Sequence, residues 1–407
     1  MGLGFGLKEA SSLTYTGEVC ETSIRGVMLA TAGIFASMGY FLVYSMGAFL
    51  SWRNVAKICI SVPICIFTAV SFIPETPIWL LSKNRQKEAQ KSLQWLRGCV
   101  TSEMVHEEYQ QLQEYCIVSN SCVNCAKQTI KCEHTESLND KLKQITRRRI
   151  IKPFILITSL QFFLQFCAIN SWRPYMIQIL KAYTVRWDGN MVTVVLSSLG
   201  FVGRLILLPI LKTMGKRRIY LASSLVTFLC CFGLSAIGFT FFPSTDWSSF
   251  EMASPSSASN STITSSSMNA TALRESVGNY SYLALALILI MQFAVNSGIS
   301  MVPFILISEV FPFKLRSMLC SITTTDRYIF VAISSKIYYN IETWFSLPGA
   351  AAFYGFISLT GFIVMYLILP ETEGRSLQDI EIHFSDNSRR ITDIQIRRNQ
   401  PDCEITK

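Results

Sequence analysis

Glu309-Val-Phe-Pro-Phe-Lys-Leu-Arg316 repeats a pattern that is already present near the start of the chain, at Glu18-Val-Cys-Glu-Thr-Ser-Ile-Arg25. Both stretches begin with Glu-Val and place an arginine seven residues after the glutamate. Each is followed by a long apolar region and then by Pro-Glu-Thr, at residues 74–76 and 370–372. Two widely separated copies of one signature indicate an internal duplication. In an apolar chain, paired halves are typical of a transporter whose substrate site lies between them.

The composition indicates residence in a membrane. Of the 407 residues, 50% are hydrophobic and 15% are charged, whereas soluble globular proteins carry about 25% charged residues. A helix of about 20 apolar residues crosses a hydrocarbon core of roughly 30 Å. Five runs of about this length or longer contain no Asp, Glu, Lys or Arg, and they are residues 26–49, 153–172, 219–245, 280–308 and 343–369.

Three further runs are apolar but contain charged residues. They are residues 54–73 with Lys57, residues 190–211 with Arg204, and residues 317–340 with Asp326, Arg327 and Lys336. We interpret residues 1–17 as the remainder of another span. The sequence therefore predicts an all-α membrane protein with eight or nine transmembrane helices.

Lys and Arg are distributed unevenly between alternate loops. The 74–152 loop holds thirteen of them, and the tail 370–407 is also basic, whereas the loops on the opposite side hold few. By the positive-inside rule, we expect 74–152 and the C-terminus to lie in the cytosol. Within this loop, residues 83–98 have the spacing of a short amphipathic helix. The net charge of +9 then reflects membrane topology. The sequence lacks a basic stripe combined with aromatic residues, so we do not expect nucleic-acid binding.

The predicted outside loop 244–280 is rich in serine and contains three N-x-[ST] sequences. They begin at Asn260, Asn269 and Asn279, and they favour a glycosylated outer surface. The alternative is that a Ser/Thr-rich stretch produces such triplets by chance. The thirteen cysteines do not predict a disulfide framework. Cys122-x-x-Cys125 has zinc-knuckle spacing, but the outer spacings fit no metal site, so we expect no metal or other cofactor.

Outward from the repeats, the motifs resemble the sugar porter branch of the major facilitator superfamily. Pro74-Glu-Thr-Pro-Ile-Trp-Leu-Leu81 is similar to the PESPRWLL element of that family, and Pro370-Glu-Thr-Glu-Gly-Arg-Ser-Leu377 to its PETKGxxL element. Gly215-Lys-Arg-Arg218 resembles the GRR turn between its eighth and ninth helices, and Glu309…Arg316 the element between its tenth and eleventh. Residues 87–98 most resemble the insect facilitated trehalose transporter group.

The resemblance implies a helical bundle of two halves, and it covers eight or nine of the usual twelve helices. It divides the chain into a partial N-terminal half at 1–73, the cytosolic loop 74–152, a six-helix C-terminal half at 153–369 and the cytosolic tail 370–407. It begins at the fourth helix of the family. Because a two-half carrier needs both halves, an alternative is a truncated sensor or regulator that does not transport.

The repeated motifs lie at the cytosolic ends of predicted spans, where carboxylates and guanidinium groups can pair across neighbouring helix ends. We predict that such contacts hold the two halves closed on the inside and break during transport. The alternative is that these charges only anchor helix ends at the interface. The residues predicted for the contacts are Glu18, Arg25, Glu75, Arg217, Glu309, Arg316 and Glu371.

A sugar site needs hydrogen-bond partners for hydroxyls and a flat apolar surface for the ring. Polar groups inside a span are costly and face the bundle interior, which points to Gln161, Gln165 and Asn170. Leu164-Gln-Phe-Cys-Ala-Ile-Asn170 resembles the QQLSGIN element that lines the family's sugar pocket. The resemblance adds Asn296, Phe304 in place of a pocket Trp, and Tyr328 in an Arg327-Tyr328 pair that replaces Asn-Trp. Hydrogen bonding between helices is the alternative role.

Arg204 and Arg327 are unexpected inside spans, and Asp326 is a candidate to neutralise one of them. The function that we expect is facilitative transport of a sugar, trehalose or a hexose, across the plasma membrane. A different solute, a polyol or an organic anion, is the second hypothesis, and a non-transporting regulator is the third. No catalytic constellation suggests an enzyme. The partners that we expect are the sugar substrate and the lipid bilayer, and the sequence does not identify a protein partner.

Overall fold

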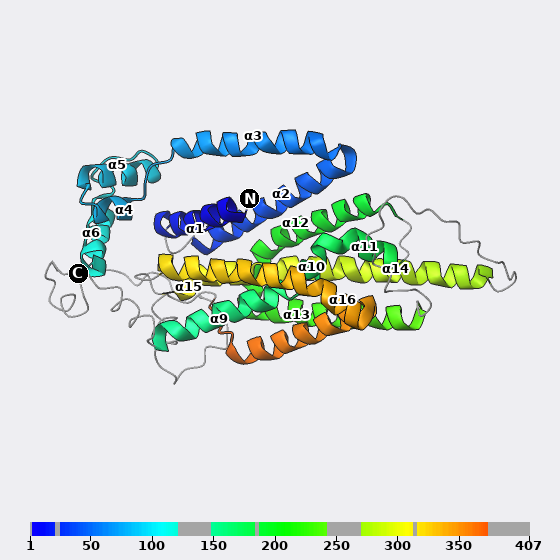
Figure 1. Ribbon diagram of the computed structural model, residues 1–407. Helices are drawn as coiled ribbons and strands as arrows, with labels where there is room; N and C mark the ends of the chain where they lie inside the picture. The colour runs from blue at the N-terminus through cyan, green and yellow to red at the C-terminus, as the bar shows by residue number, and fades with distance from the viewer. Residues whose placement is uncertain are drawn as a thin grey trace.

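The computed structural model describes residues 2–20, 25–120, 148–183, 187–241, 270–311 and 316–372, and their regular structure is helical (Figure 1). The first three helices, α1 (Gly2–Val19), α2 (Arg25–Phe49) and α3 (Trp52–Ser71), form what we call the N-terminal half. Helix α3 lies along the outside of the bundle, and none of its residues is buried. A largely apolar helix without buried residues fits a lipid environment.

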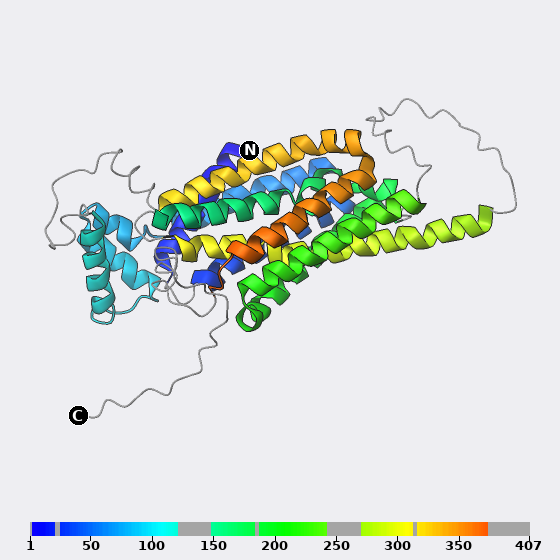
Figure 2. The same cartoon turned by 90° about the horizontal axis from the view of Figure 1, so that it is seen from below.

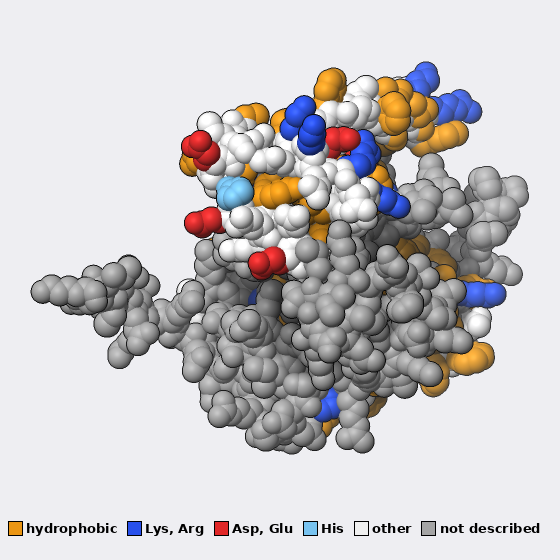
Figure 3. Space-filling view, turned by 90° about the vertical axis from the view of Figure 1, so that its left-hand side faces the viewer, with side chains coloured by type: hydrophobic (Ala, Val, Ile, Leu, Met, Phe, Trp, Pro, Cys, Tyr) orange, Lys and Arg blue, Asp and Glu red, His pale blue; other side chains and the backbone are white. Residues whose placement is uncertain are grey.

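Three short helices follow, namely α4 (Pro77–Ser82), α5 (Gln86–Leu96) and α6 (His106–Asn120). Thr76 caps α4 by accepting a hydrogen bond from Trp79 N at 3.2 Å. Cys116 of α6 packs into the small core of this unit, and burial, with a contribution from Glu18, raises the pKa of its thiol. Figure 3 shows this end of the molecule, where acidic and basic side chains lie side by side.

What we call the C-terminal half begins with a broken helix. Helix α9 (Arg148–Gln165) is followed after a 52° bend by α10 (Ala168–Trp172), the 3-10 turn η1 (Arg173–Tyr175) and α11 (Met176–Ala182). Helices α12 (Gly189–Met214) and α13 (Lys216–Phe241) come next. The bend at residues 166–167 frees backbone carbonyls, and the carbonyl of Gln165 accepts hydrogen bonds from Ser171 and Ser334.

The last spans are α14 (Ala270–Ala294), the π-helical turn η2 (Val295–Ile299), α15 (Val302–Val310) and α16 (Arg316–Ile368). Helix α14 begins ten residues before the predicted span at 280 and projects beyond the bundle (Figure 2). Asn260 and Asn269 of the predicted glycosylated loop lie outside the described residues, as does the side chain of Asn279.

Helix α16 contains 53 residues but is two helices joined at a break. Ser346 has φ 60° and ψ 170°, and Pro348 follows it. At 1.5 Å per residue, an unbroken helix of this length would extend about 80 Å, more than twice the hydrocarbon thickness. Figures 1 and 2 show that α16 reverses its direction part way along its length, so that it crosses the bundle twice.

Among the described residues, six helices are long and apolar enough to span a membrane, or seven when the bent α9–α11 pair is included. The break in α16 adds one more pass and gives the eight spans that the five uncharged runs and the three charged apolar runs predict together. The prediction of an all-α membrane protein is therefore confirmed. Helix α1, which carries Lys8 and Glu9, is not among these spans.

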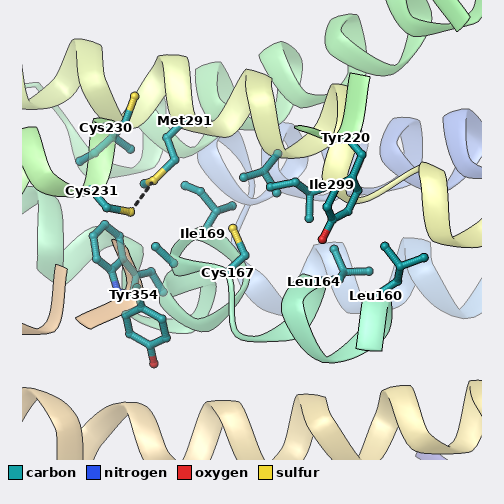
Figure 4. Close-up of a cluster of buried hydrophobic side chains, with 14 of the residues drawn as sticks. Leu160, Leu164, Cys167, Ile169, Tyr220, Cys230, Cys231, Met291, Ile299 and Tyr354 are labelled. Atoms are coloured by element: carbon teal, nitrogen blue, oxygen red, sulfur yellow. Dashed lines mark hydrogen bonds between the residues drawn. The ribbon is translucent and has the colours of Figure 1, made fainter. Parts of the chain in front are cut away.

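The largest buried cluster lies within the C-terminal half, between α9, α10, α13, α14 and α16 (Figure 4). Close helix approach sustains it. A Cβ on Gly298 of η2 would overlap Ser223 of α13 and come within 2.9 Å of the Ile219 carbonyl oxygen. Inside a bilayer, helices associate through such tight packing because lipid tails are as apolar as the side chains.

Candidate functional site

A cavity of about 510 Å³ lies between the second half of α2 and the helices α10–α12 and α14 of the C-terminal half. Its hydroxyl and amide groups come from both halves and are Ser37, Asn190, Thr193, Ser197, Gln292 and Asn296. The aromatic side chains of Tyr40, Tyr44 and Trp52 line it on the side of the N-terminal half. The volume falls within the range of about 300–1,000 Å³ that is usual for small-molecule sites.

Asn296 and Gln292 form one wall of the cavity. The Asn296 side-chain amide donates to the Gln292 carbonyl oxygen at 2.9 Å, and the Gln292 side-chain amide donates to the Leu196 carbonyl oxygen at 3.2 Å. These bonds fix the orientation of both amides. Gly200 gives them room, since a Cβ there would lie 3.1 Å from Asn296 Nδ2 and 3.2 Å from Gln292 Nε2.

Arg204 of α12 lies directly behind this wall and is 9% exposed. Its Nη2 donates to Asn296 Oδ1 at 3.2 Å and to Ser300 Oγ at 3.0 Å, and its Nη1 donates to the Gly33 carbonyl oxygen at 2.7 Å. Because Gly33 belongs to α2, Arg204 connects the two halves and holds the cavity amide at the same time.

Arg173 of η1 forms part of another wall. Its Nη2 donates to Asn170 Oδ1 at 3.2 Å, and its guanidinium lies over the Tyr40 ring at 5.0 Å from the centroid. Asn170 in turn donates to the Leu164 carbonyl oxygen at 2.7 Å, a carbonyl next to the bend. Asn170 therefore acts on the cavity through Arg173, which belongs to its lining.

The residues that the sequence predicts for the sugar site divide into three groups. Asn296 lines the cavity, and Asn170 stands behind it. Gln161 and Gln165 face the core of the C-terminal half and are absent from the cavity lining, because α9 is covered by α16 and α15. Gln161 is 1% exposed, and within the described part of the chain neither polar atom of its side-chain amide has a hydrogen-bond partner.

Phe304 and Tyr328, the remaining predicted residues, surround a buried ion pair instead of the cavity. Arg327 of α16 pairs with Glu9 of α1, and both side chains are 14% exposed. The Tyr328 hydroxyl also donates to Glu9, and the Arg327 guanidinium lies 5.0 Å from the centroid of the Phe304 ring. This cluster joins the N-terminal half to the C-terminal half.

The expected neutralisation by Asp326 is wrong for both arginines. Asp326 instead accepts a hydrogen bond from the Thr158 hydroxyl at 3.4 Å. Successive residues of a helix point in different directions, so Asp326 turns towards α9 while Arg327 turns towards α1. Arg204 has no carboxylate partner in the described part of the chain and is held by neutral oxygens.

At the predicted cytosolic end, the described contacts of the repeated motifs lie within each half. Glu18 accepts a hydrogen bond from the Thr76 hydroxyl at 2.7 Å, which ties α1 to the start of α4. Glu371, 1% exposed, accepts from the backbone N–H groups of Lys216 and Arg217 at 3.1 Å each. A carboxylate in this position satisfies the free N–H groups and the positive end of α13.

This arrangement differs from the predicted contacts between the halves. Arg217 donates to the Tyr366 carbonyl oxygen at 2.7 Å and meets Glu371 through its backbone N–H. Glu75 accepts a hydrogen bond from Ser92 through its backbone carbonyl. Both Pro-Glu-Thr elements follow directly on the last helix of a half, so their neighbours are helix ends of that half. The side chains of Arg25, Glu309 and Arg316 lie outside the described residues.

Sequence reasoning missed Glu9, Arg173 and Gln292. Glu9 lies in a segment too short and too polar to be assigned as a full span. Arg173 falls one residue beyond the uncharged run 153–172, where it looks like an interfacial charge. Gln292 lies within the uncharged run 280–308 and four residues before Asn296, so its helical spacing to Asn296 was the signal that could have identified it.

Comparisons with known proteins agree with this architecture. The family described as "Sugar (and other) transporter" matches residues 1–384. The facilitated trehalose transporter Tret1 of Apis mellifera ligustica is 27% identical over 98% of this chain and 70% of its own length. Tret1 of Bombyx mori is 24% identical over 97% of this chain and 68% of its own length.

Solved structures show the same fold. The proton:xylose symporter XylE of the major facilitator superfamily, bound to 6-bromo-6-deoxy-D-glucose, superposes with a TM-score of 0.63 at 16% identity over 92% of this chain and 70% of that chain. The partially occluded inward open form of XylE from E. coli gives 0.60 at 17% identity with the same coverage. With its spans, its repeated motifs and a polar cavity between two halves, the chain belongs to the sugar (and other) transporter family.

Proposed function

We propose that this chain carries a neutral sugar, trehalose or a hexose, across the plasma membrane by facilitated diffusion. The observation that supports this most directly is the cavity between α2 and the C-terminal half, where hydroxyls, amides and aromatic rings converge. Amide side chains donate and accept without carrying charge, and aromatic rings offer flat surfaces to a sugar ring. The Tret1 relatives, which are named as trehalose transporters, favour a disaccharide among the candidates.

The geometry also supports alternating access. The cavity lies at the end of α2 that leads into residues 50–53, which the loop charges assign to the outside. Deeper in the bundle, the halves are joined by the Glu9–Arg327 ion pair and by the bond from Arg204 to Gly33. Release of a sugar to the cytosol requires these two connections to break and the halves to rock.

Uptake of labelled trehalose and glucose into proteoliposomes tests the proposal. We expect saturable flux that stops at equal concentrations on the two sides and that does not change when a proton gradient is collapsed. Gln292→Ala removes a cavity amide and should lower the uptake rate at subsaturating sugar by about tenfold, the loss of one to two hydrogen bonds.

Gln178→Ala is the matched control, because Gln178 is an exposed amide on α11 that does not line the cavity. Its uptake should equal that of the unaltered chain. Well-inserted protein that shows no saturable flux of either sugar would contradict the proposed function. Accumulation of sugar that follows the proton gradient would contradict the facilitative mechanism.

A further inference from the structure

The two charged side chains described at the cavity, one in its lining and one behind it, are both positive. Arg173 is the one charged side chain among the described residues that line it, and Arg204 lies immediately behind Asn296. Arg173 contacts the neutral Asn170 and the ring of Tyr40, and Arg204 contacts three neutral oxygens. Neither arginine has a carboxylate partner in the described part of the chain.

The part-buried arginine of this membrane region, Arg327, is balanced by a counter-charge. It pairs with Glu9 of α1. Arg204 is more deeply buried, and its Nε has no hydrogen-bond partner among the described residues. An unbalanced cation in a region of low dielectric produces a positive potential in an adjoining cavity.

Asp188, two residues before the lining residue Asn190, does not remove this potential. Asp188 precedes α12, and its side chain accepts a hydrogen bond from the backbone N–H of Asn190 at 3.3 Å. Asp188 is exposed and sits at the N-terminus of its own helix, where solvent screens it and the helix end offsets its charge.

Arg173 is also prepared for a ligand. A guanidinium has five N–H donors, of which the hydrogen bond to Asn170 uses one. The stacking on Tyr40 fixes the plane of the group without using its edge. A planar, oriented guanidinium edge is suited to a carboxylate, which it can bind through two parallel hydrogen bonds.

We propose that the cavity prefers a sugar that carries one carboxylate to the neutral sugar of the same size, with Arg173 binding the carboxylate and Arg204 supplying positive potential from behind Asn296. The inference rests on the proposed function in using the same cavity. It adds a substrate class, the monosaccharide acids, that the neutral-sugar hypothesis does not contain.

Glucuronate and glucose are suitable probes because they differ in the oxidation state of one carbon and little in size. With the purified full chain, the half-saturating concentration for protection against thermal unfolding should be at least about tenfold lower for glucuronate, as expected for one charge-assisted contact. Uptake of both probes into proteoliposomes should show the same order.

Two substitutions at Arg173 identify the group responsible. Arg173→Gln should bring the ratio of the two half-saturating concentrations close to one, while Arg173→Lys should keep a preference for glucuronate. Lys181→Gln is the matched control, because it removes an exposed cation on α11 that is not part of the cavity lining. This variant should keep the full preference.

The outcomes separate the two proposals. Glucose that protects as well as glucuronate, or a preference that survives in Arg173→Gln, overturns the preference for acids while leaving sugar transport standing. Preferential protection by glucuronate without uptake of any probe supports the preference and overturns the transport proposal. Loss of preference in Lys181→Gln assigns the effect to general surface charge and also overturns the inference.

Discussion

Two arginines inside the membrane-spanning helices are accommodated in different ways. Arg327 forms an ion pair with Glu9 and is enclosed by Tyr328 and Phe304, whereas Arg204 donates to neutral oxygens on α2 and near η2. The first arrangement is a self-contained connection between the halves. The second leaves positive potential beside the cavity. The hydrogen bond from Arg204 to Asn296 Oδ1 also gives Arg204 a positioning role for that amide.

Glu9→Gln should destabilise the protein strongly, because it leaves the buried Arg327 guanidinium without its counter-charge. Breaking one partner of a buried ion pair costs about 3–5 kcal/mol. The measurement is thermal unfolding of the purified protein in detergent. The double variant Glu9→Gln/Arg327→Gln removes both charges and should recover most of the loss, whereas a double variant no more stable than the single one would show that the pair is not coupled.

Several residue-scale features could be predicted from the sequence and others could not. The resemblance to the family pointed to Asn296, and the structure places this residue in the cavity lining. The partner of Arg327 could not be predicted, since Glu9 is 318 residues away in the chain and only tertiary structure brings the two together. A charged residue in an apolar run indicates an energetic cost inside the membrane, but the sequence does not identify the group that offsets this cost.

At the scale of elements, the turn between α14 and α15 is the most tightly constrained. Val295–Ile299 form a π-helical turn that brings Asn296 to the cavity and presses Gly298 against α13. A π-helical turn inserts an extra residue into a helix and often marks a functional site. The run 280–308 predicted one continuous span, because hydropathy contains no signal for a change in helical pitch.

Gly298→Ala should destabilise the packing of this turn on α13. The new Cβ would overlap Ser223 and approach the Ile219 carbonyl oxygen, so that the helices must separate, at a cost of about 1–3 kcal/mol. Thermal unfolding again provides the measurement. Gly39→Ala on α2, where no atom lies within 4 Å of the added Cβ, is the control and should be close to neutral. Equal effects of both substitutions would argue against the close contact.

The break in α16 is the second instructive element. The gap between the predicted spans 317–340 and 343–369 places a turn within a few residues of Ser346, where the structure has it. Loop charge and apolar run length therefore located the reversal. They did not indicate its form, a single residue with positive φ followed by Pro348, because the sequence offers no glycine at that position.

At the scale of the molecule, the contacts between the halves lie deep in the bundle and the cavity lies towards one end. Helix α2 contacts both α12 and α15, and α1 contacts α16. The repeated Glu…Arg and Pro-Glu-Thr motifs predicted the family and the order of helices. The described contacts of Glu18 and Glu371 join neighbouring helix ends, and the side chains of Arg25, Glu309 and Arg316 lie outside the described residues, so the contacts between the halves stay a prediction.

The orientation of the cavity is open to a direct test. Thr193→Cys places a thiol in the lining, and we expect a membrane-impermeant thiol reagent to modify it from the outside of intact cells at a rate that excess sugar lowers. Thr227→Cys, fully buried in α13, is the control and should not react. Labelling is measured against the unaltered chain because of the native cysteines. Reaction of Thr193→Cys from the cytosolic side alone would reverse the assigned topology.

The contact between Glu9 and Arg327 has a consequence for how this chain can change over evolutionary time. Neither position can be altered alone without leaving a lone charge inside the membrane, although the two residues lie 318 positions apart in the chain. A substitution at one position is therefore expected to be accompanied by a substitution at the other. Among descendants and relatives of this chain, we expect the acid and the base to be inherited together or lost together, replaced by two neutral residues.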